Sequence, residues 1–176
     1  MRPVLSEWIT RPYSLDRSPR MSTLEERVAR LEAQVQAVTD RDAIVELTGR
    51  YCRAVESDDI EAIIALFTED ASLETAFPPD SGQDHSSTTG HAALRDTYKG
   101  TAGMGLMPCV HNHVVELHGD RARSFCSVEL RLIQSGVAYT ASGHYEDQFR
   151  RVAGEWRFQL RKLVLYHWVP QTEGWA

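Results

Sequence analysis

Hydrophobic residues along this chain change from a helical spacing to a strand spacing near its middle. From residue 24 to about residue 67 they recur every three or four positions, as in amphipathic helices. From about residue 110 onward they alternate with polar residues, as in strands with one face on a core. This order predicts an α+β fold in which three to four helices pack on the concave face of a curved, mostly antiparallel sheet.

The first helical segment opens on a capping box and carries a heptad seam. Ser22-x-x-Glu25 is the predicted box, which would satisfy free backbone N–H groups at the helix start. Apolar residues then follow at spacings of 4, 3, 4 and 3, namely Leu24, Val28, Leu31, Val35 and Val38. The seam covers about two heptads, fewer than a free-standing coiled coil needs. The helix over 22–38 therefore lies along its own domain or pairs with a partner subunit, and we expect it to contribute to oligomerisation.

More helices are predicted before the sheet. Thr39-Asp40 offers a new N-cap, from which a second amphipathic helix would run to about Ser57. Asp58 or Asp59, just after it, caps a third, short helix. A fourth helix is expected at about 91–99. Between them, residues 77–90 are polar and rich in turn-forming residues. A loop of this length inside a compact domain is either disordered or a lid over a site.

One short strand and four long ones complete the predicted elements. Turns containing glycine separate the long strands. The expected strands are Ser72–Ala76, 110–117, 121–133, 137–150 and 155–168. We divide the chain into residues 1–21, a flexible extension or an arm that docks on a neighbouring subunit; the heptad helix 22–38; a domain over 39–170; and the tail 171–176.

Composition narrows the class of protein. A formal net charge of −6 argues against a general nucleic-acid binder, whose footprint would be basic. No run approaches the roughly 18 apolar residues of a membrane span. The three cysteines, Cys52, Cys109 and Cys126, form no Cys-x-x-Cys pair, so neither a zinc site nor a disulfide framework is indicated. Without a secretory segment, a cytoplasmic location is predicted.

Two late strands carry a recognisable pattern. The first holds Gly143-x-Tyr145-x-Asp147 and the second opens on Trp156-Arg157-Phe158. With Tyr51 and Glu56 near a helix end, the pattern resembles the SnoaL-like branch of the nuclear transport factor 2-like superfamily over about residues 40–169. The resemblance implies a cone-shaped pocket between helices and sheet, with no metal and no cofactor. It also implies a dehydratase, isomerase or cyclase that acts by proton transfer on an apolar polycyclic or polyketide-like metabolite.

The resemblance assigns roles to Tyr51 and Glu56. In the dehydratases of this family a tyrosine and an aspartate at this spacing line the mouth of the pocket. Tyr51 would accordingly hydrogen-bond a substrate oxygen, while Glu56 would act as the base or would orient His111. The alternative is that Glu56 is a solvated residue at a helix end. Tyr145 and Asp147 are expected to be structural, and His144 to face the other way into solvent.

A histidine expected from the resemblance is missing from its usual position. The family commonly shows His-x-x-x-Asn-x-x-x-Glu in this strand, and aligning its Asn with Asn112 puts Pro108 where the His belongs. On a regular strand His111 and His113 face away from Asn112. A bulge after Pro108 could turn His111 inward as the proton-transfer group. The alternative is that both histidines lie on the other face of the sheet.

The last predicted catalytic residue is Arg161, five positions after Trp156. In dehydrochlorinase-like members an arginine here assists the acid–base pair or binds the leaving group. Because its strand face is otherwise mostly apolar, Arg161 needs an acidic or anionic partner. Glu56 is the predicted partner, and a surface salt bridge to Glu129 or Glu146 is the alternative.

Two other functions are compatible with the sequence. A SnoaL-like pericyclase would fold a polyene for cycloaddition in a pocket that needs shape rather than an acid–base pair. A non-catalytic ligand-binding or assembly module would fill the pocket with its own side chains. The predicted substrate-binding residues are Trp168, Asn112, Met107 and Phe77. The expected partners are an apolar small molecule and one or two further copies of the chain, in a homodimer or homotrimer.

Overall fold

The computed structural model describes residues 23–77 and 83–171. The predictions for residues 1–21 and 172–176 lie outside the described residues. The chain divides into two compact units, residues 1–34 and 35–176. Of the first unit only the beginning of helix α1 is described, and its side chains are exposed.

Helix α1 runs without interruption from Leu24 to Glu56. Its capping box lies one residue later than predicted. Glu26 donates its backbone N–H to Thr23 Oγ1 at 3.2 Å, and Thr23 donates its own to Glu26 Oε2 at 2.9 Å. Two free N–H groups of the helix start are thereby satisfied.

The helix start predicted at Asp40 is wrong because tertiary partners occupy its carboxylate. Asp40 is only 8% exposed, and its Oδ1 accepts a hydrogen bond from Trp156 Nε1 at 3.1 Å. Arg151 Nη2 lies 2.7 Å from the same oxygen. The aspartate therefore ties the helix to the sheet and leaves its backbone helical.

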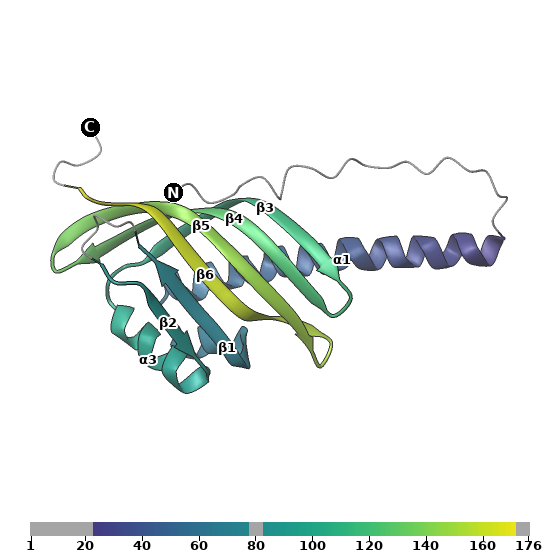
Figure 1. The fold of residues 1–176 in the computed structure, drawn as a ribbon, viewed down its shortest axis with the longest axis horizontal. Coiled ribbons are helices and arrows are strands. Elements are labelled where there is room, and N and C mark those ends of the chain that lie inside the picture. The colour runs from purple at the N-terminus through teal and green to yellow at the C-terminus, as the bar shows by residue number, and fades with distance from the viewer. Residues whose placement is uncertain (1–22, 78–82, 172–176) are drawn as a thin grey trace. The chain divides into compact units, whose positions relative to one another are not determined.

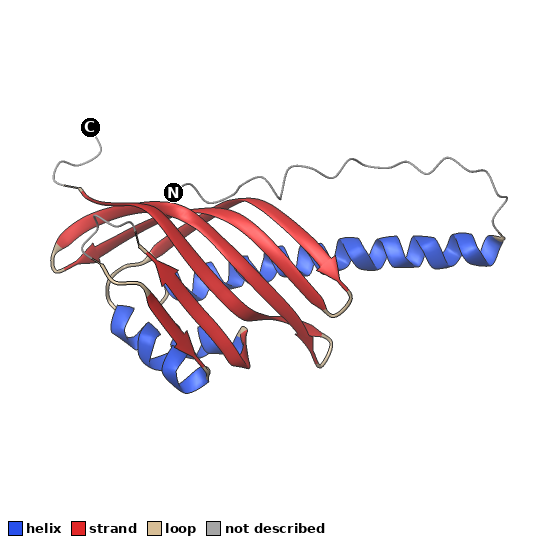
Figure 2. Cartoon of the chain, in the orientation of Figure 1, coloured by secondary structure: helices blue, strands red, loops and turns tan. Residues whose placement is uncertain are grey.

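Two shorter helices match their predictions. Helix α2 spans Ile60–Ala65 and is capped by Asp59, whose carboxylate accepts the N–H of Ala62 at 3.0 Å. Helix α3 spans His91–Thr101. Figure 2 shows α3 and the second half of α1 against one side of the strands.

In the described part of the chain, six strands form one curved sheet in the order β2-β1-β6-β5-β4-β3 (Figure 1). Among these strands only the β1–β6 pair is parallel, so the predicted mostly antiparallel sheet is confirmed. β2 was not predicted: it lies in the segment expected to be a loop and pairs with β1. The strands are β1 (Phe67–Ala76), β2 (Ser86–Thr89), β3 (Met107–His118), β4 (Arg121–Gln134), β5 (Val137–Val152) and β6 (Glu155–Pro170).

Bulges in β3 and β6 reverse the alternation of side chains. In β3, His111 pairs with β4 in one register and Val114 in another, and Asn112 between them has φ of 57°. In β6, Gln159 and Tyr166 are each an extra residue relative to β5. Because side chains alternate with period two, each extra residue exchanges the faces of everything beyond it.

The core lies between the concave face of the sheet and the helices. Its main cluster joins Ile44, Leu47 and Tyr51 of α1 to Phe149 and Phe158 of the sheet. A second cluster continues along the same face of the sheet and includes Cys126, Val128, Leu130, Ala141, Tyr145 and Leu165. Half-buried aromatic residues pack against this second cluster.

Gly143 in β5 has no room for a side chain. A Cβ there would collide with the backbone carbonyl oxygen of Val164 and lie 2.9 Å from Leu165 Cα. We expect Gly143→Ala to lower the free energy of unfolding by about 1–3 kcal/mol through overpacking. Gly49, in the middle of α1, has nothing within 4 Å of such a Cβ. Gly49→Ala is the control and is expected to stabilise by about 0.5–1 kcal/mol. Equal urea midpoints for the two variants would contradict this account.

Candidate functional site

A fully buried ion pair lies on the concave face of the sheet. Arg161 Nη1 donates to Asp147 Oδ2 at 3.1 Å, and the two residues are 0% and 2% exposed. They are direct neighbours on β6 and β5. Both predicted partners of Arg161, namely Glu56 and a surface glutamate, are therefore wrong. The bulge at Gln159 explains the inward direction of Arg161, since an unbroken alternation from buried Phe158 would point it outward.

Aromatic rings enclose the guanidinium group. The Arg161 Cζ atom lies 3.6 Å from the ring centre of Tyr145, 4.0 Å from that of Tyr51 and 4.6 Å from that of Phe158. Tyr51 Oη lies 3.0 Å from Tyr98 Oη, so the two phenols share a hydrogen bond. The negative faces of these rings stabilise the buried cation. The structure thus brings together two of the predicted catalytic residues, Tyr51 and Arg161.

Several polar atoms around this pair are buried without a hydrogen-bond partner among the described residues. They are Arg161 Nε and Nη2, Asp147 Oδ1, Ser124 Oγ and His113 Nε2. Ser124 is the direct neighbour of Asp147 across β4 and β5. An unpartnered buried polar atom costs about 1–3 kcal/mol. Such atoms call for a bound water, ion or ligand.

His113, and not His111, faces the interior. The bulge at Asn112 places both Val110 and His113 on the half-buried side of β3 and leaves His111 exposed. Burial, and then the positive charge of Arg161, lower the pKa of His113 below its ordinary 6.5. His113 is therefore a neutral imidazole at pH 7 and can accept a proton.

Burial sets the protonation of the other groups. It raises the pKa of Asp147 to about 7, although Arg161 acts in the opposite direction. Burial alone would lower the pKa of Arg161, but Asp147 and the neighbouring tyrosines outweigh it and hold the pKa above its ordinary value. Burial also raises the pKa of Tyr51, despite the charge of Arg161. At pH 7 Arg161 is charged and Tyr51 is a neutral donor.

The half-buried Cys52 thiol and the buried Cys126 thiol are not activated. Burial raises the pKa of Cys126 to about 12 and also raises that of Cys52, although Arg161 opposes both shifts. Since the thiolate is the nucleophile, neither residue suits nucleophilic catalysis at neutral pH.

Glu56 lies outside this buried cluster. Its side chain is 44% exposed and its carboxylate is 4.0 Å from Arg53. It lines an open groove of about 950 Å³ together with Cys52 and Pro108. The groove thus contains the two positions where the resemblance expects the acid and the histidine, with a proline at the second. A pocket of about 540 Å³ beside Asp40 and Trp156 is separate, and His113, Asp147 and Arg161 line neither hollow.

The four predicted substrate-binding residues fall into two groups. Phe77 and Trp168 are half-buried and meet edge to face, with ring centres 5.4 Å apart. Tyr139 lies 5.5 Å from Trp168, so the three rings form an aromatic wall. The bulge at Tyr166 turns Trp168 onto the concave side. In contrast, Asn112 is exposed at its bulge, and Met107 is 39% exposed at the start of β3.

On the opposite face of the sheet His144 is buried, so the prediction that it is solvated is wrong. Its ring stacks on Phe125 at 4.8 Å, and Nδ1 lies 2.6 Å from Tyr166 Oη. Its Nε2 lies 3.2 Å from Glu146 Oε1. Neighbouring side chains therefore shield the imidazole from water, contrary to the prediction from the sequence pattern.

Within residues 23–77 and 83–171, no group of three or more His, Cys, Asp or Glu side chains is arranged to hold a metal ion. No helix there combines the length and the apolar character needed to cross a membrane.

The sequence model of the SnoaL-like domain matches residues 36–162. This chain belongs to the SnoaL-like family. The match begins inside α1 and ends one residue after Arg161, so it includes Tyr51, His113, Asp147 and Arg161. A search of curated proteins finds no match.

Solved structures with the same fold include several from Novosphingobium aromaticivorans. A candidate scytalone dehydratase has a TM-score of 0.66 at 20% identity, covering 77% of this chain and 90% of its own. A candidate aromatic ring hydroxylase has a TM-score of 0.65 at 27% identity, covering 76% and 94%. Another solved structure, of a type 2 hexachlorocyclohexane dehydrochlorinase and outside that group, has a TM-score of 0.67 at 15% identity, covering 81% of this chain and 95% of its own. Proteins that share this fold thus include some named as enzymes, and the fold of this chain is the nuclear transport factor 2-like fold.

Sequence reasoning missed the inward direction of His113. One signal for it was present: asparagine tolerates a positive φ better than most residues, so Asn112 inside a strand indicates a bulge. The structural role expected for Asp147 agrees with its burial and with its hydrogen bond from Arg161.

Proposed function

We propose that this protein is a cofactor-independent enzyme that moves a proton on an apolar, oxygen-bearing metabolite of polycyclic or polyketide-like type. The proposal rests on the buried polar atoms around Arg161 that have no partner among the described residues. A substrate oxygen would satisfy the free Arg161 N–H groups and offset the cost of their burial. Proteins of the same fold that are named as a candidate scytalone dehydratase and a dehydrochlorinase fit an elimination reaction.

Each residue has a distinct role in this proposal. Neutral His113 accepts a proton from a carbon next to a carbonyl group, which replaces the role predicted for His111. Arg161 stabilises the negative oxygen that forms, and Tyr51 adds a hydrogen bond from its phenol. Asp147 holds Arg161 in place as a positioning residue. Glu56 lines a separate open groove and is not the base in this proposal.

The first test is proton exchange on a simple probe. We expect the protein to accelerate deuterium uptake from D2O at the α-carbon of 2-tetralone, an apolar bicyclic ketone, followed by mass spectrometry. Heat-denatured protein at the same concentration is the control. If the folded protein exchanges no faster than this control, the proposed enolisation chemistry is rejected for ketones of this size.

The pH dependence of exchange follows from His113. Its pKa lies below 6.5 in the folded protein, so the neutral base form predominates above that pH. We expect a rate plateau above about pH 6.5 after buffer-catalysed exchange is subtracted, and a fall only at more acidic pH. A rate that instead rises steadily between pH 7 and pH 9 would point to another base.

The aromatic wall supports a second candidate function. Phe77, Tyr139 and Trp168 offer flat apolar surfaces, and Pro108 stands where the family commonly has histidine. A pericyclase needs this kind of surface to hold a polyene in a folded shape. Such an enzyme would show a rate independent of pH between 6 and 9 and insensitive to replacement of His113.

A non-catalytic assembly module is the third candidate. The rings of Tyr51, Tyr145 and Phe158 around Arg161 would then serve only as packing. This alternative predicts that the fluorescent apolar probe 1-anilinonaphthalene-8-sulfonate does not bind the folded chain. Saturable binding that 2-tetralone displaces would argue against it.

A further inference from the structure

Helix α1 carries two apolar stripes. The second half of the helix buries one stripe in the core, with Ile44, Leu47, Tyr51, Ala54 and Val55 between 0% and 7% exposed. The first half carries the seam residues Leu24, Val28, Leu31, Val35 and Val38, which are between 43% and 73% exposed. The seam is therefore a row of apolar side chains without cover in the described part of the chain.

The residue types in the seam favour two strands. Val28 and Val35 occupy the a positions of a heptad, and Leu24, Leu31 and Val38 occupy the d positions. Valine at a with leucine at d favours a parallel two-stranded coiled coil over three or four strands. The pattern therefore distinguishes a dimer from a trimer, which the spacing alone leaves open.

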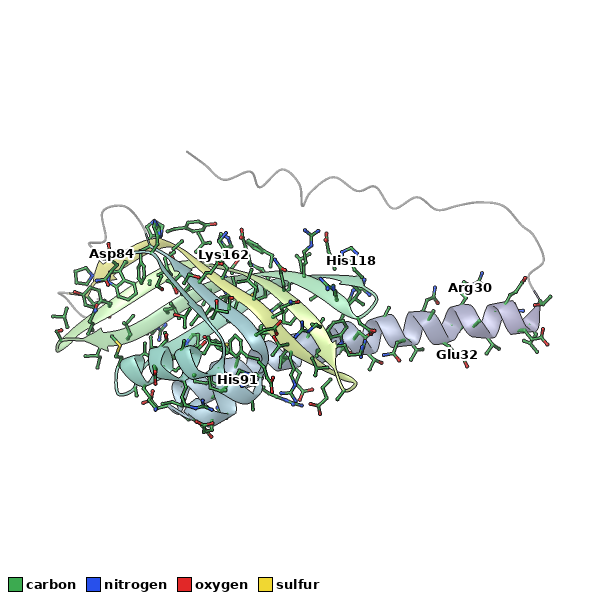
Figure 3. The ribbon with its side chains drawn as sticks, turned by 60° about the horizontal axis from the view of Figure 1, so that its bottom comes forward. Arg30, Glu32, Asp84, His91, His118 and Lys162 are labelled. Carbon is green, nitrogen blue, oxygen red and sulfur yellow. The ribbon has the colours of Figure 1, made fainter. Side chains whose placement is uncertain are left out.

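The flanking charges favour a second copy of this chain. Arg27 occupies a g position and Glu32 the e position five residues later. In a parallel, in-register pair these side chains meet across the seam, once on each side. Neither residue has an ion pair among the described residues. Figure 3 shows Glu32 on the surface of α1.

We propose that residues 24–38 form a parallel two-stranded coiled coil with the same segment of a second copy. The proposal is independent of the enzymatic function, since none of its residues belongs to the buried cluster. It depends only on the apolar seam and on the opposite charges of Arg27 in one copy and Glu32 in the other.

Sedimentation equilibrium of the full chain tests the proposal. We expect a reversible dimer for the wild type and at least an approximately tenfold higher dissociation constant for Leu31→Glu, which puts a charge into the seam. Ala33→Glu adds the same charge at an exposed position outside the seam and should leave the dissociation constant unchanged. A monomeric or trimeric wild type, or equal behaviour of the two variants, would overturn the proposal.

A charge exchange tests direction and register with little risk to folding. At low salt, Arg27→Glu and Glu32→Arg should each weaken the dimer about threefold to fivefold, because each creates two like-charge pairs. The double variant should regain the wild-type dissociation constant. An antiparallel pair brings g against g and e against e, where each exchange only replaces one like-charge pair by another. Single variants that dimerise as tightly as the wild type, or a double variant that does not recover, therefore reject the parallel arrangement. Far-UV circular dichroism checks that each variant is folded.

Discussion

Asp147→Leu is expected to lower the free energy of unfolding by about 3–5 kcal/mol at pH 7, because it leaves Arg161 buried without a counter-charge. Arg161 is fully buried and cannot lose its proton at any pH that the fold tolerates. Urea unfolding followed by tryptophan fluorescence measures the change. The matched control is Asp70→Leu, which removes an exposed partner of Arg150 and should cost no more than about 1 kcal/mol.

Removal of the cation by Arg161→Met should lower the free energy of unfolding less than Asp147→Leu does, by an amount that depends on pH. With Arg161→Met, only burial acts on Asp147, so its folded pKa rises further above the ordinary 3.8. The folded state of this variant then binds the Asp147 proton more tightly than the unfolded state does. The stability of the variant is therefore fully present below pH 3.8, and part of it is lost as pH rises through the folded pKa of Asp147. We expect Arg161→Met to cost less at pH 5 than at pH 8. The double variant Asp147→Leu with Arg161→Met should recover much of the loss. A double variant as unstable as Asp147→Leu alone would show that the charge is not the cause.

His113→Gln is expected to reduce proton exchange on 2-tetralone by about 10²–10⁴-fold, the usual contribution of a general base. The amide keeps a hydrogen-bonding group at the position but cannot take up the proton. His111→Gln is a closely matched control, because that residue is two positions away and exposed. Its rate should equal that of the wild type.

The pH profile separates a base from a structural residue. If His113 only supported the fold, His113→Gln would lower the rate equally at every pH and would lower the urea midpoint. If His113 is the base, the variant loses the acid limb of the profile while its urea midpoint stays close to the wild-type value. Equal rates for the two glutamine variants would remove His113 from the mechanism.

The order and type of the helices and strands could be predicted because each follows from a pattern averaged over many residues. The long alternating segment predicts the first residue of β4 correctly and its last residue within one position. The acidic residues after α1 predict the cap of α2. The uninterrupted α1 could not be foreseen, since Asp40 is a good cap in isolation and is held instead by Arg151 and Trp156. Partners more than a hundred residues away in the chain decide its role.

The site was less predictable because single inserted residues determine it. Tyr51 and Arg161 were identified, and the structure brings them together. His113 depends on the bulge at Asn112, and Trp168 depends on the one at Tyr166. Asparagine gave a hint of the first bulge, but neither Gln159 nor Tyr166 has a residue type that marks a bulge. The partner of Arg161 followed from strand pairing that the sequence pattern alone does not define.

The bulge at Asn112 shows how β3 can vary in length. Without Asn112, His111 opposite Ser127 would be followed directly by His113 opposite Cys126, in an unbroken ladder. His113 would then keep its present side of the sheet, and Val115 and Leu117 would still pack on the core. Relatives that lack this residue would keep the same inward position, so comparisons among them should follow strand pairing and not residue count.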